Sequence, residues 1–279
     1  MSNTAEFLAR LGVSDAVLVS VHAHRGSVPR EAGSWMAVFA DALVGSIGGG
    51  HLELQATQEA RMRLHGQPGL AYVRYALGPA LGQCCGGEVH LAFERVSALD
   101  HPRLELQFRH QQAALPLVAL FGGGHVGRAL IQVLGNLPLH VRWIDSRDEI
   151  FPGVVPVNVE CEHSQPVHGA LASLAPHAHV LIMSFSHAED LDLVAACLKR
   201  QRERADVAFI GLIGSQTKWA TFSRRLLERG FTAHELAQVT CPIGVRGISS
   251  KEPEVIAIGV AAQLLQAFER KVSPGNDSI

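Results

Sequence analysis

The chain has 279 residues, 47% of them hydrophobic and 18% charged, with a formal net charge of −2. Such a composition is typical of a globular protein, and the length allows two domains that each bury a core. A charge so close to neutral provides no extended positive surface for nucleic acid or for an anionic membrane, so we expect neither as a partner. The longest nearly apolar run, residues 255–265, is too short to span a bilayer.

The five cysteines are odd in number and follow no C-x-x-C spacing, and no H-E-x-x-H motif is present. This pattern predicts reduced thiols in a cytoplasmic protein rather than disulfides or a zinc site. Residues 1–11 lack a basic segment followed by an apolar core, so no signal peptide is expected. The pairs His22/His24 and His177/His179 could each present two metal ligands from one strand face, but exposed or strand-end histidines are the favoured interpretation.

The first part of the chain, residues 1–99, is predicted to be a small α+β domain. Short β-branched and apolar segments predict a mostly antiparallel sheet, and a helical pattern in its middle stops before Gly66. Three of its loops are rich in glycine. The predicted strands are residues 16–22, 35–39, 42–47, 70–76 and 88–93, and the predicted helix is 51–64.

A polar segment, residues 100–115, separates this part from the rest. It is rich in Gln, His and Arg, contains Pro102 and is followed by Pro116. The composition allows either a helix or a linker, and in both cases we place the domain boundary within it. The second domain then comprises residues 116–279.

In residues 116–279, strand patterns alternate with helix patterns. Such alternation predicts a parallel, doubly wound, Rossmann-like sheet, so the chain is expected to belong to the α/β class. The last helix is apolar on most sides and is expected to be deeply buried. The predicted strands are residues 117–121, 139–144, 154–159, 179–185 and 207–213, and the last helix is 253–268.

Gly122, Gly124 and Gly127 stand at G-x-G-x-x-G spacing between the first of these strands and a helical pattern. In dinucleotide-binding folds the first glycine permits a tight turn, the second lets the backbone approach a pyrophosphate, and the third lets the helix pack on the strand. The helix N-terminus adds free N–H groups and the positive end of its dipole. Asp145 ends the next strand, about twenty residues further on, where an acid usually holds a ribose hydroxyl. The pattern therefore predicts a nucleotide site, with His125 at its turn.

Residues 48–51 repeat the sequence Gly-Gly-Gly-His, again between a strand and a helix. The N–H groups of Gly48, Gly49 and Gly50 could form a nest that binds an anion, and the alternative is a tight turn without a ligand. Glu53 is expected to cap its helix electrostatically, with acid–base chemistry as the less favoured alternative.

Cys84 and Cys85 are adjacent and are flanked by glycines, which expose them and supply N–H groups that lower the pKa of a thiol. A thiolate there could ligate a soft metal, carry sulfur or hold a cofactor; the alternative is a pair of half-buried thiols at a strand start. Arg30, in another glycine-rich loop, could bind a phosphate or carboxylate, or pair with Glu31.

Further polar residues follow the predicted strands of the second domain, at the edge where open α/β sheets place ligands. Lys218 lies one turn inside a helix and could reach an anion, and Arg147 could accept an extra phosphate or be solvated. Cys161 and Cys197 are expected to be structural. The strand-end residues are Ser184, Ser186 and His187, then Gly214 and Ser215, and then the loop at residues 241–247.

Taken together, these motifs resemble the xanthine dehydrogenase accessory protein family, XdhC/CoxI, over nearly the whole chain. The N-terminal half is similar through Gly-Ser-Val-Pro-Arg (26–30), Gly-Gly-Gly-His-Leu-Glu (48–53) and Gly-Gln-Cys-Cys-Gly-Gly (82–87). The C-terminal half is similar through Gly-Gly-Gly-His-Val-Gly (122–127), Asp-Ser-Arg (145–147), Gly-Ser (214–215) and Cys-Pro-Ile-Gly (241–244).

The resemblance implies a molybdenum cofactor chaperone rather than an enzyme that turns over a substrate. Such proteins bind the molybdopterin cofactor, protect it from oxidation and present it to a cysteine desulfurase, which adds the terminal sulfur ligand. They then help to insert it into the molybdenum subunit of xanthine dehydrogenase. By this resemblance the turn at residues 122–127 would hold a phosphate or a nucleotide, and Cys84 and Cys85 would face the molybdenum or the incoming sulfur in a cleft between the domains. A homodimer is expected, and the ligand could be the pterin monophosphate or its cytosine dinucleotide.

Two other classes of function fit parts of the sequence. The glycine motif and Asp145 also suit an NAD(P)-dependent oxidoreductase, although no proton donor pairs with a substrate pocket in the sequence. The apolar last helix would also suit a purely structural partner of a larger enzyme.

Overall fold

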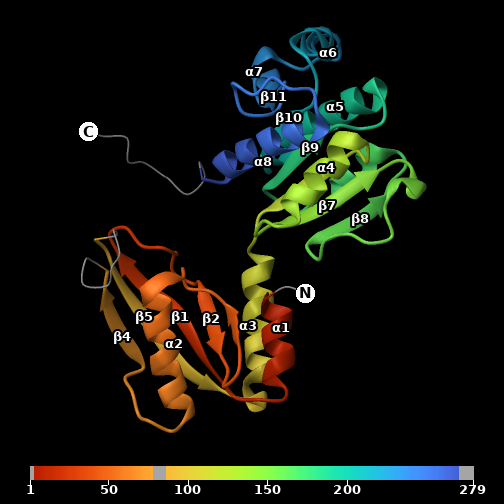
Figure 1. Ribbon diagram of the computed structural model, residues 1–279. Coiled ribbons are helices and arrows are strands. Elements are labelled where there is room, and N and C mark those ends of the chain that lie inside the picture. The colour runs from red at the N-terminus through yellow and green to blue at the C-terminus, as the bar shows by residue number, and fades with distance from the viewer. Residues whose placement is uncertain (1–2, 78–85, 270–279) are drawn as a thin grey trace. The chain divides into compact units, whose positions relative to one another are not determined.

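The computed structural model describes residues 3–77 and 86–269. The chain divides into two compact units between Ala113 and Ala114 (Figure 1). The first contains an antiparallel sheet and the second a parallel sheet. This confirms the α/β class and the Rossmann-like architecture predicted for the second half. In the described ranges no helix is long and apolar enough to cross a bilayer.

The first unit is built on an antiparallel sheet with the order β3-β2-β1-β5-β4. Its central strand β1 pairs with both β2 and β5, so that Val19 lies opposite Met36 on one side and Phe93 on the other. A bulge between Val21 and Ala23 shifts the register near the end of β1. The elements are α1 (Asn3–Leu11), β1 (Ala16–Arg25), β2 (Trp35–Val38), β3 (Leu43–Gly45), α2 (Gly50–Leu64), β4 (Tyr72–Ala76), β5 (Glu88–Val96) and α3 (His101–Ala113).

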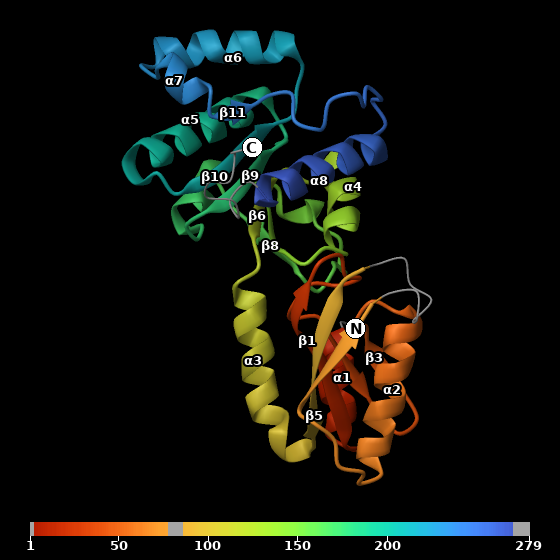
Figure 2. The same cartoon turned by 90° about the vertical axis from the view of Figure 1, so that its left-hand side faces the viewer.

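Helices cover both faces of this sheet because successive side chains of a strand point to opposite faces and both sets are apolar here. Val17 and Val19 belong to the core that Leu52 of α2 completes. Leu18 belongs to a second core, shared with Phe7 of α1. Figure 2 shows α2 and α3 on opposite sides of the sheet.

Helix α3 occupies most of the segment predicted to be a helix or a linker. Leu104 and Phe108, four residues apart on one helix face, are buried in the core shared with α1 and the sheet. Residues 101–113 therefore belong to the first unit, and the division of the chain falls after this helix rather than before it.

The described strands of the second unit are all parallel and follow the order β11-β10-β9-β6-β7-β8. The chain runs outward from β6 through β7 to β8 and then returns to place β9 on the other side of β6. This is the strand order of dinucleotide-binding folds, in which ligands bind at the carboxyl edge where the order reverses, here between β6 and β9. The elements are β6 (Leu117–Phe121), α4 (His125–Leu134), β7 (His140–Asp145), β8 (Val159–His163), β9 (Ala178–Ile182), α5 (His187–Arg204), β10 (Val207–Leu212), α6 (Gln216–Glu228), α7 (Ala233–Leu236), β11 (Val239–Thr240) and α8 (Pro253–Glu269).

Two helical layers sandwich this sheet. Leu120 of β6 belongs to the core that α4 and α8 complete, whereas its neighbour Phe121 belongs to the core that α5 and α6 complete. Helices α4 and α8 lie side by side on one face (Figure 1). Because β6 and β9 are buried on both faces, their sequences are nearly continuous apolar runs, whereas the edge strand β8 is mostly polar.

The strand β8 begins later than the sequence pattern predicts. Residues 154–158 form a connection, and the strand starts at Val159. Pro156 has no N–H group for a strand ladder, and the Asn158 side chain donates a hydrogen bond to the carbonyl oxygen of Leu134 at 3.0 Å. The apolar residues before Val159 therefore belong to the connection from β7 to β8, which contacts the end of α4, instead of extending the strand.

We predict that Phe108→Ala lowers the free energy of unfolding by about 3–5 kcal/mol, because it leaves a cavity in the core under α3. Leu106→Ala is the matched control, since Leu106 is 58% exposed on the same helix and Phe108 is 5% exposed. Urea unfolding followed by circular dichroism measures both variants. Equal effects of the two substitutions would contradict the packing of α3 on the first unit.

Candidate functional site

The turn between β6 and α4 combines closely packed glycines with one open glycine, Gly124. Gly122 has a φ of +126°, and a Cβ there would lie 1.9 Å from the carbonyl oxygen of Met183. A Cβ on Gly127 would lie 2.2 Å from the carbonyl oxygen of Gly122, so this glycine lets α4 pack against the turn. A Cβ on Gly124 would have no neighbour within 4 Å. The exposed Gly124 is therefore where a ligand can approach the backbone at the start of α4, next to the exposed His125.

Asp145, at the end of β7, has its carboxylate hydrogen-bonded to other groups of the protein. Its carboxylate is 1% exposed and accepts a hydrogen bond of 2.6 Å from the Gly123 N–H. It also accepts hydrogen bonds from Arg147, from the backbone N–H at 3.0 Å and from Nε and Nη2 at 2.9 Å each. The expectation that this acid holds a ribose hydroxyl does not match this buried position.

The pKa of Asp145 reflects the same contacts. Burial alone raises the pKa of this carboxyl, but the hydrogen bonds from Arg147 and from the Gly123 N–H outweigh burial and leave the pKa below its ordinary value. Asp145 is thus an ionised anchor that ties the turn after β6 to the loop after β7.

Arg147 and Phe185 stack beside the glycine turn. The guanidinium carbon lies 4.5 Å from the centre of the Phe185 ring, and Phe185 is 65% exposed. Ser146 donates a hydrogen bond of 2.7 Å to Glu189, at the start of α5, and so joins the loops that follow β7 and β9. Phe185 is not among the predicted site residues, although its neighbours in the sequence, Ser184 and Ser186, were expected at the ligand edge of the sheet. An aromatic residue between two serines just after a buried parallel strand is the signal that could have found it.

A buried ion pair joins the ends of β9 and β10. Asp190 accepts hydrogen bonds from the N–H of Ser184 at 2.8 Å, from its hydroxyl at 2.7 Å and from Lys218 Nζ at 2.6 Å. Lys218 also donates to the carbonyl oxygen of Ile213 at 2.8 Å. The two charged side chains are 11% (Lys218) and 3% (Asp190) exposed, so Lys218 holds two loops together instead of extending to an anion at the surface.

Gly214 and Ser215 support this arrangement. Ser215 is the N-cap of α6 and accepts a hydrogen bond from the Lys218 N–H at 3.2 Å. A Cβ on Gly214 would lie 2.6 Å from the Lys218 side chain, so glycine leaves room for Lys218 to fold back. Both predicted residues therefore lie at the carboxyl edge of the sheet, where they shape the loop after β10.

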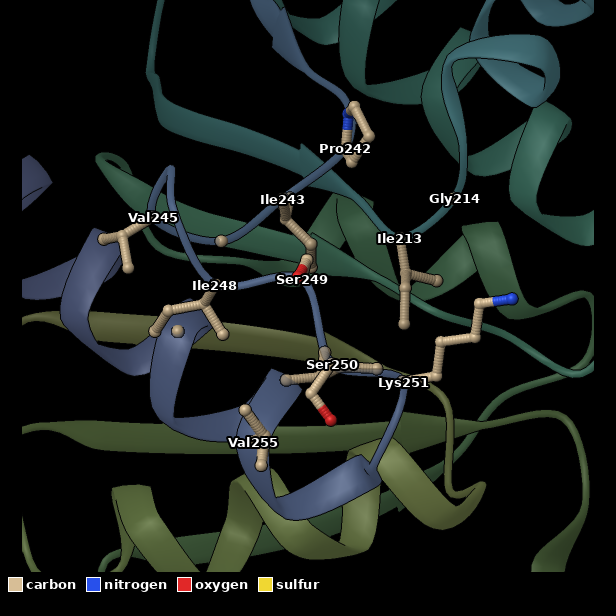
Figure 3. A pocket seen from close by; sticks show the side chains of 13 residues that line it. Ile213, Gly214, Pro242, Ile243, Val245, Ile248, Ser249, Ser250, Lys251 and Val255 are labelled. Carbon is tan, nitrogen blue, oxygen red and sulfur yellow. The ribbon is translucent and has the colours of Figure 1, made fainter.

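A pocket of about 290 Å³ opens next to Gly214 (Figure 3). Apolar side chains dominate its wall, and Lys251 is the only charged residue that lines it within the described part of the chain. It lies between the ends of β10 and β11 and the first turns of α8. Its principal lining residues are Ile213, Pro242, Ile243, Ile248, Ser249 and Val255.

In the first unit, the three glycine-rich motifs meet. A Cβ on Gly48 would lie 2.4 Å from the Pro29 side chain, next to Arg30, and a Cβ on Gly87 would lie 2.2 Å from the carbonyl oxygen of Ser27. The loop after β1 is therefore in van der Waals contact with the loop after β3 and with Gly87, just before β5, and only residues without a Cβ permit it. Arg30 itself is exposed at this junction.

Hydrogen bonds within the Gly48–Gly50 loop use two of the amides that were expected to bind an anion. Glu53 accepts hydrogen bonds of 3.0 Å from Ile47 and from Gly49, and one of 2.6 Å from the Ser46 hydroxyl. The Gly48 N–H donates to the Ser46 hydroxyl oxygen at 3.1 Å. Glu53 thus caps the start of α2, as favoured from the sequence. The turn after β6 uses its first two amides in a similar way, since the N–H groups of Gly122 and Gly123 donate to the Ile144 carbonyl oxygen and to Asp145.

The predicted thiol pair, Cys84 and Cys85, lies outside the described residues. Burial raises the pKa values of the three cysteines that the structure does describe: Cys197 to about 12, Cys241 to about 11, and Cys161 in the same direction. These three are thiols, not thiolates, at neutral pH. Across residues 3–77 and 86–269, no group of three or more His, Cys, Asp or Glu side chains is arranged to hold a metal ion.

Family models match both units. The model described as the XdhC Rossmann domain matches residues 118–264, and the model of the XdhC and CoxI family matches residues 13–76. The chain belongs to the XdhC family. The resemblance inferred from the motifs is thereby confirmed, and the Rossmann description agrees with the strand order of the second unit.

The proteins similar to this chain include a bacterial relative and two solved structures. The chain is 26% identical over 246 residues to the uncharacterized protein YqeB of Escherichia coli K12; the match covers 87% of this chain but 41% of YqeB, so the chain spans less than half the length of that relative. A crystal structure titled as a xanthine dehydrogenase (BH1974) from Bacillus halodurans is similar with a TM-score of 0.78, 20% identity and 98% coverage of both chains. A Rossmann-fold NAD(P)-binding family protein from Shigella flexneri has a TM-score of 0.35 and 14% identity, covering 59% of this chain and 97% of its own.

The lowered pKa of Asp145 makes stability depend on pH. Its ionised form contributes stability that is fully present above the unfolded value of about 3.9 and is lost as the pH falls through the lower folded value. We predict that Asp145→Asn is less stable at pH 7 and loses less stability than the native chain between about pH 4 and pH 2. Urea unfolding at stepped pH measures this, with Asp148→Asn as control, because Asp148 is exposed and lies three residues later in the chain. Parallel pH profiles for the native chain and Asp145→Asn would contradict the assignment.

We also predict that Lys218→Met lowers the free energy of unfolding by about 3–5 kcal/mol, because it leaves the Asp190 carboxylate buried and unpaired. Adding Asp190→Asn to the same chain is expected to restore part of this loss. Lys199→Met, on exposed α5 surface, is the control and is expected to change stability by less than about 1 kcal/mol. Chemical unfolding of the three variants provides the comparison, and a neutral Lys218→Met would show that the ion pair does not hold these loops.

Proposed function

We propose that this protein is a molybdenum cofactor chaperone that supports the maturation of xanthine dehydrogenase. The observation that carries the proposal is the open Gly124 at the start of α4, in a chain that belongs to the XdhC family. A phosphate-bearing ligand is the chemistry that such a helix start binds. The likeness to a structure titled as a xanthine dehydrogenase supports the fold of both units.

The residues at the carboxyl edge of the parallel sheet fit such a ligand. Gly122 and Gly127 fix the turn by close packing, so the N–H groups at the start of α4 are held in place before a ligand arrives. The apolar pocket beside Gly214, with Lys251 and the hydroxyls of Ser249 and Ser250, suits a flat heterocycle with polar edges. When bound, the cofactor supplies a pterin-held molybdenum for the acceptor enzyme. The chain itself binds the phosphate, covers the ring and limits access of water.

Cys84 and Cys85 are the sulfur groups that we assign to the metal or to the incoming sulfur. The high pKa values of Cys197 and Cys241 support this choice, because a protonated, buried thiol is a poor metal ligand and nucleophile. The glycines that follow Cys85 belong to the junction with the Ser27 and Gly48 loops. The proposal includes sulfuration by a cysteine desulfurase, delivery to the molybdenum subunit, a cytoplasmic location and a homodimer as the working form.

The test is recovery of the cofactor with the purified protein. Full-length chain is produced in cells with and without molybdopterin synthesis, and bound pterin is measured by fluorescence after oxidation. We predict that Gly124→Ala folds normally but loses most of the pterin, because the added methyl enters the open space where the phosphate approaches. Gly153→Ala is the matched control, since a Cβ there also meets nothing within 4 Å.

The cysteines are tested in the same preparation. Cys84→Ala and Cys85→Ala, alone and combined, are compared with Cys161→Ala, and only the first set is expected to reduce the recovered cofactor or its terminal sulfur. Absence of pterin from the native chain made in competent cells would overturn the proposal. If both Gly124→Ala and the double cysteine variant retained all of the pterin, neither of the two contacts on which the proposal rests would be needed for binding.

A further inference from the structure

We infer that Arg147 and Phe185 form a stacking seat for the base of a nucleotide, and that the ligand of this edge therefore carries a nucleoside. The inference rests on the proposed function, in that the same edge of the sheet holds the cofactor, and it names the chemical class of the ligand further. Neither the family match nor the predicted glycine motif assigns a role to Phe185.

The first support is position. Arg147 follows β7 and Phe185 follows β9, so the pair lies at the carboxyl edge beside the point where the strand order reverses at β6. Between these two loops lies the turn of Gly122–Gly124, which provides the phosphate cradle. A base at the seat and a diphosphate at the turn would therefore occupy neighbouring positions along one edge.

The second support is that the Arg147 side chain is already held in place. The Arg147 side chain is fixed by the hydrogen bonds from Nε and Nη2 to Asp145, so its plane does not need to be ordered when a ligand binds. Its guanidinium lies 4.5 Å from the ring centre of Phe185, and the phenyl group is 65% exposed. An exposed aromatic ring is a surface on which bases stack, with little dependence on their identity.

The third support is that the carboxylate of Asp145 is buried and already hydrogen-bonded. Its carboxylate is 1% exposed and bonded to Gly123 and Arg147, so it does not read a ribose hydroxyl. Recognition of a nucleoside at this edge must then come from the base, and the sugar 2′-hydroxyl should matter little. This departs from the usual dinucleotide pattern, in which the acid after the second strand binds the ribose.

The seat also bears on the two forms of the cofactor. The pterin monophosphate has one ring system, whereas the cytosine dinucleotide adds a base beyond the diphosphate. The apolar pocket beside Gly214 lies at the end of β10, the strand next to β9, which Phe185 follows. A second ring site at the same edge of the sheet fits the dinucleotide form.

The experiment titrates the full-length chain with ADP, 2′-deoxy-ADP and inorganic pyrophosphate by isothermal calorimetry. Phe185→Leu is expected to weaken ADP about tenfold, which corresponds to the loss of one base–aromatic stack, and to leave pyrophosphate within about twofold. Phe185→Trp is expected to restore ADP affinity. Phe231→Leu is the matched control, because Phe231 lies under Arg202 in another cation–π pair after α6, away from this edge.

Three outcomes would overturn the inference. These are no ADP binding at millimolar concentration, an equal effect of Phe185→Leu on ADP and on pyrophosphate, and 2′-deoxy-ADP more than about tenfold weaker than ADP. The nucleotide titration is separate from the pterin measurement. A Phe185-dependent ADP site in a chain that recovers no pterin would retain the seat and reject the chaperone, and the reverse result would reject only the seat.

Discussion

The carboxylate of Asp145 is the contact on which the arrangement of the sheet edge depends. It is buried, ionised and bonded both to the Gly123 N–H after β6 and to the Arg147 guanidinium after β7. A buried charge is tolerated only when its hydrogen-bonding capacity is met, so the two loops are held at fixed positions around it. The open backbone at Gly124 and the stacked pair of Arg147 and Phe185 both follow from this constraint.

The two Gly-Gly-Gly-His sequences show how one local pattern can serve two purposes. At Gly48–Gly50, the glycines permit contact with Pro29, and Glu53 takes up amides of the loop. At Gly122–Gly124 no acid stands at the equivalent position in the helix, and Asp145 at the end of the next strand takes up the Gly123 amide instead. The first loop therefore contacts the segment of Pro29, whereas the second is tied to the end of β7 and begins α4 at the exposed Gly124.

The proposed function needs two kinds of group in the chain: backbone N–H groups that bind an anion, and sulfur atoms that can act as soft ligands. The second unit offers the cradle together with an apolar pocket, and its own cysteines are protonated because burial raises their pKa values. In the sequence of the first unit, Cys84 and Cys85 precede Gly86 and Gly87, and Gly87 packs against Ser27. An oxidoreductase is less well supported. Asp145 was the feature that favoured a nicotinamide nucleotide, and its carboxylate is hydrogen-bonded to Arg147.

The sequence by itself determined the fold class, the strands β6, β7, β9 and β10, the glycine turn and the family, because apolar periodicity and glycine spacing act over a few residues. It did not determine that α3 belongs to the first unit. Leu104 and Phe108 can be recognised as core residues of that unit only when the sheet that they contact is known. The contacts of Asp145 with Gly123, of Lys218 with Asp190 and of Phe185 with Arg147 join separate segments, and the two-residue strand β11 exists only through its pairing with β10. Only the tertiary structure decides such contacts, because burial and charge pairing depend on which distant segments meet.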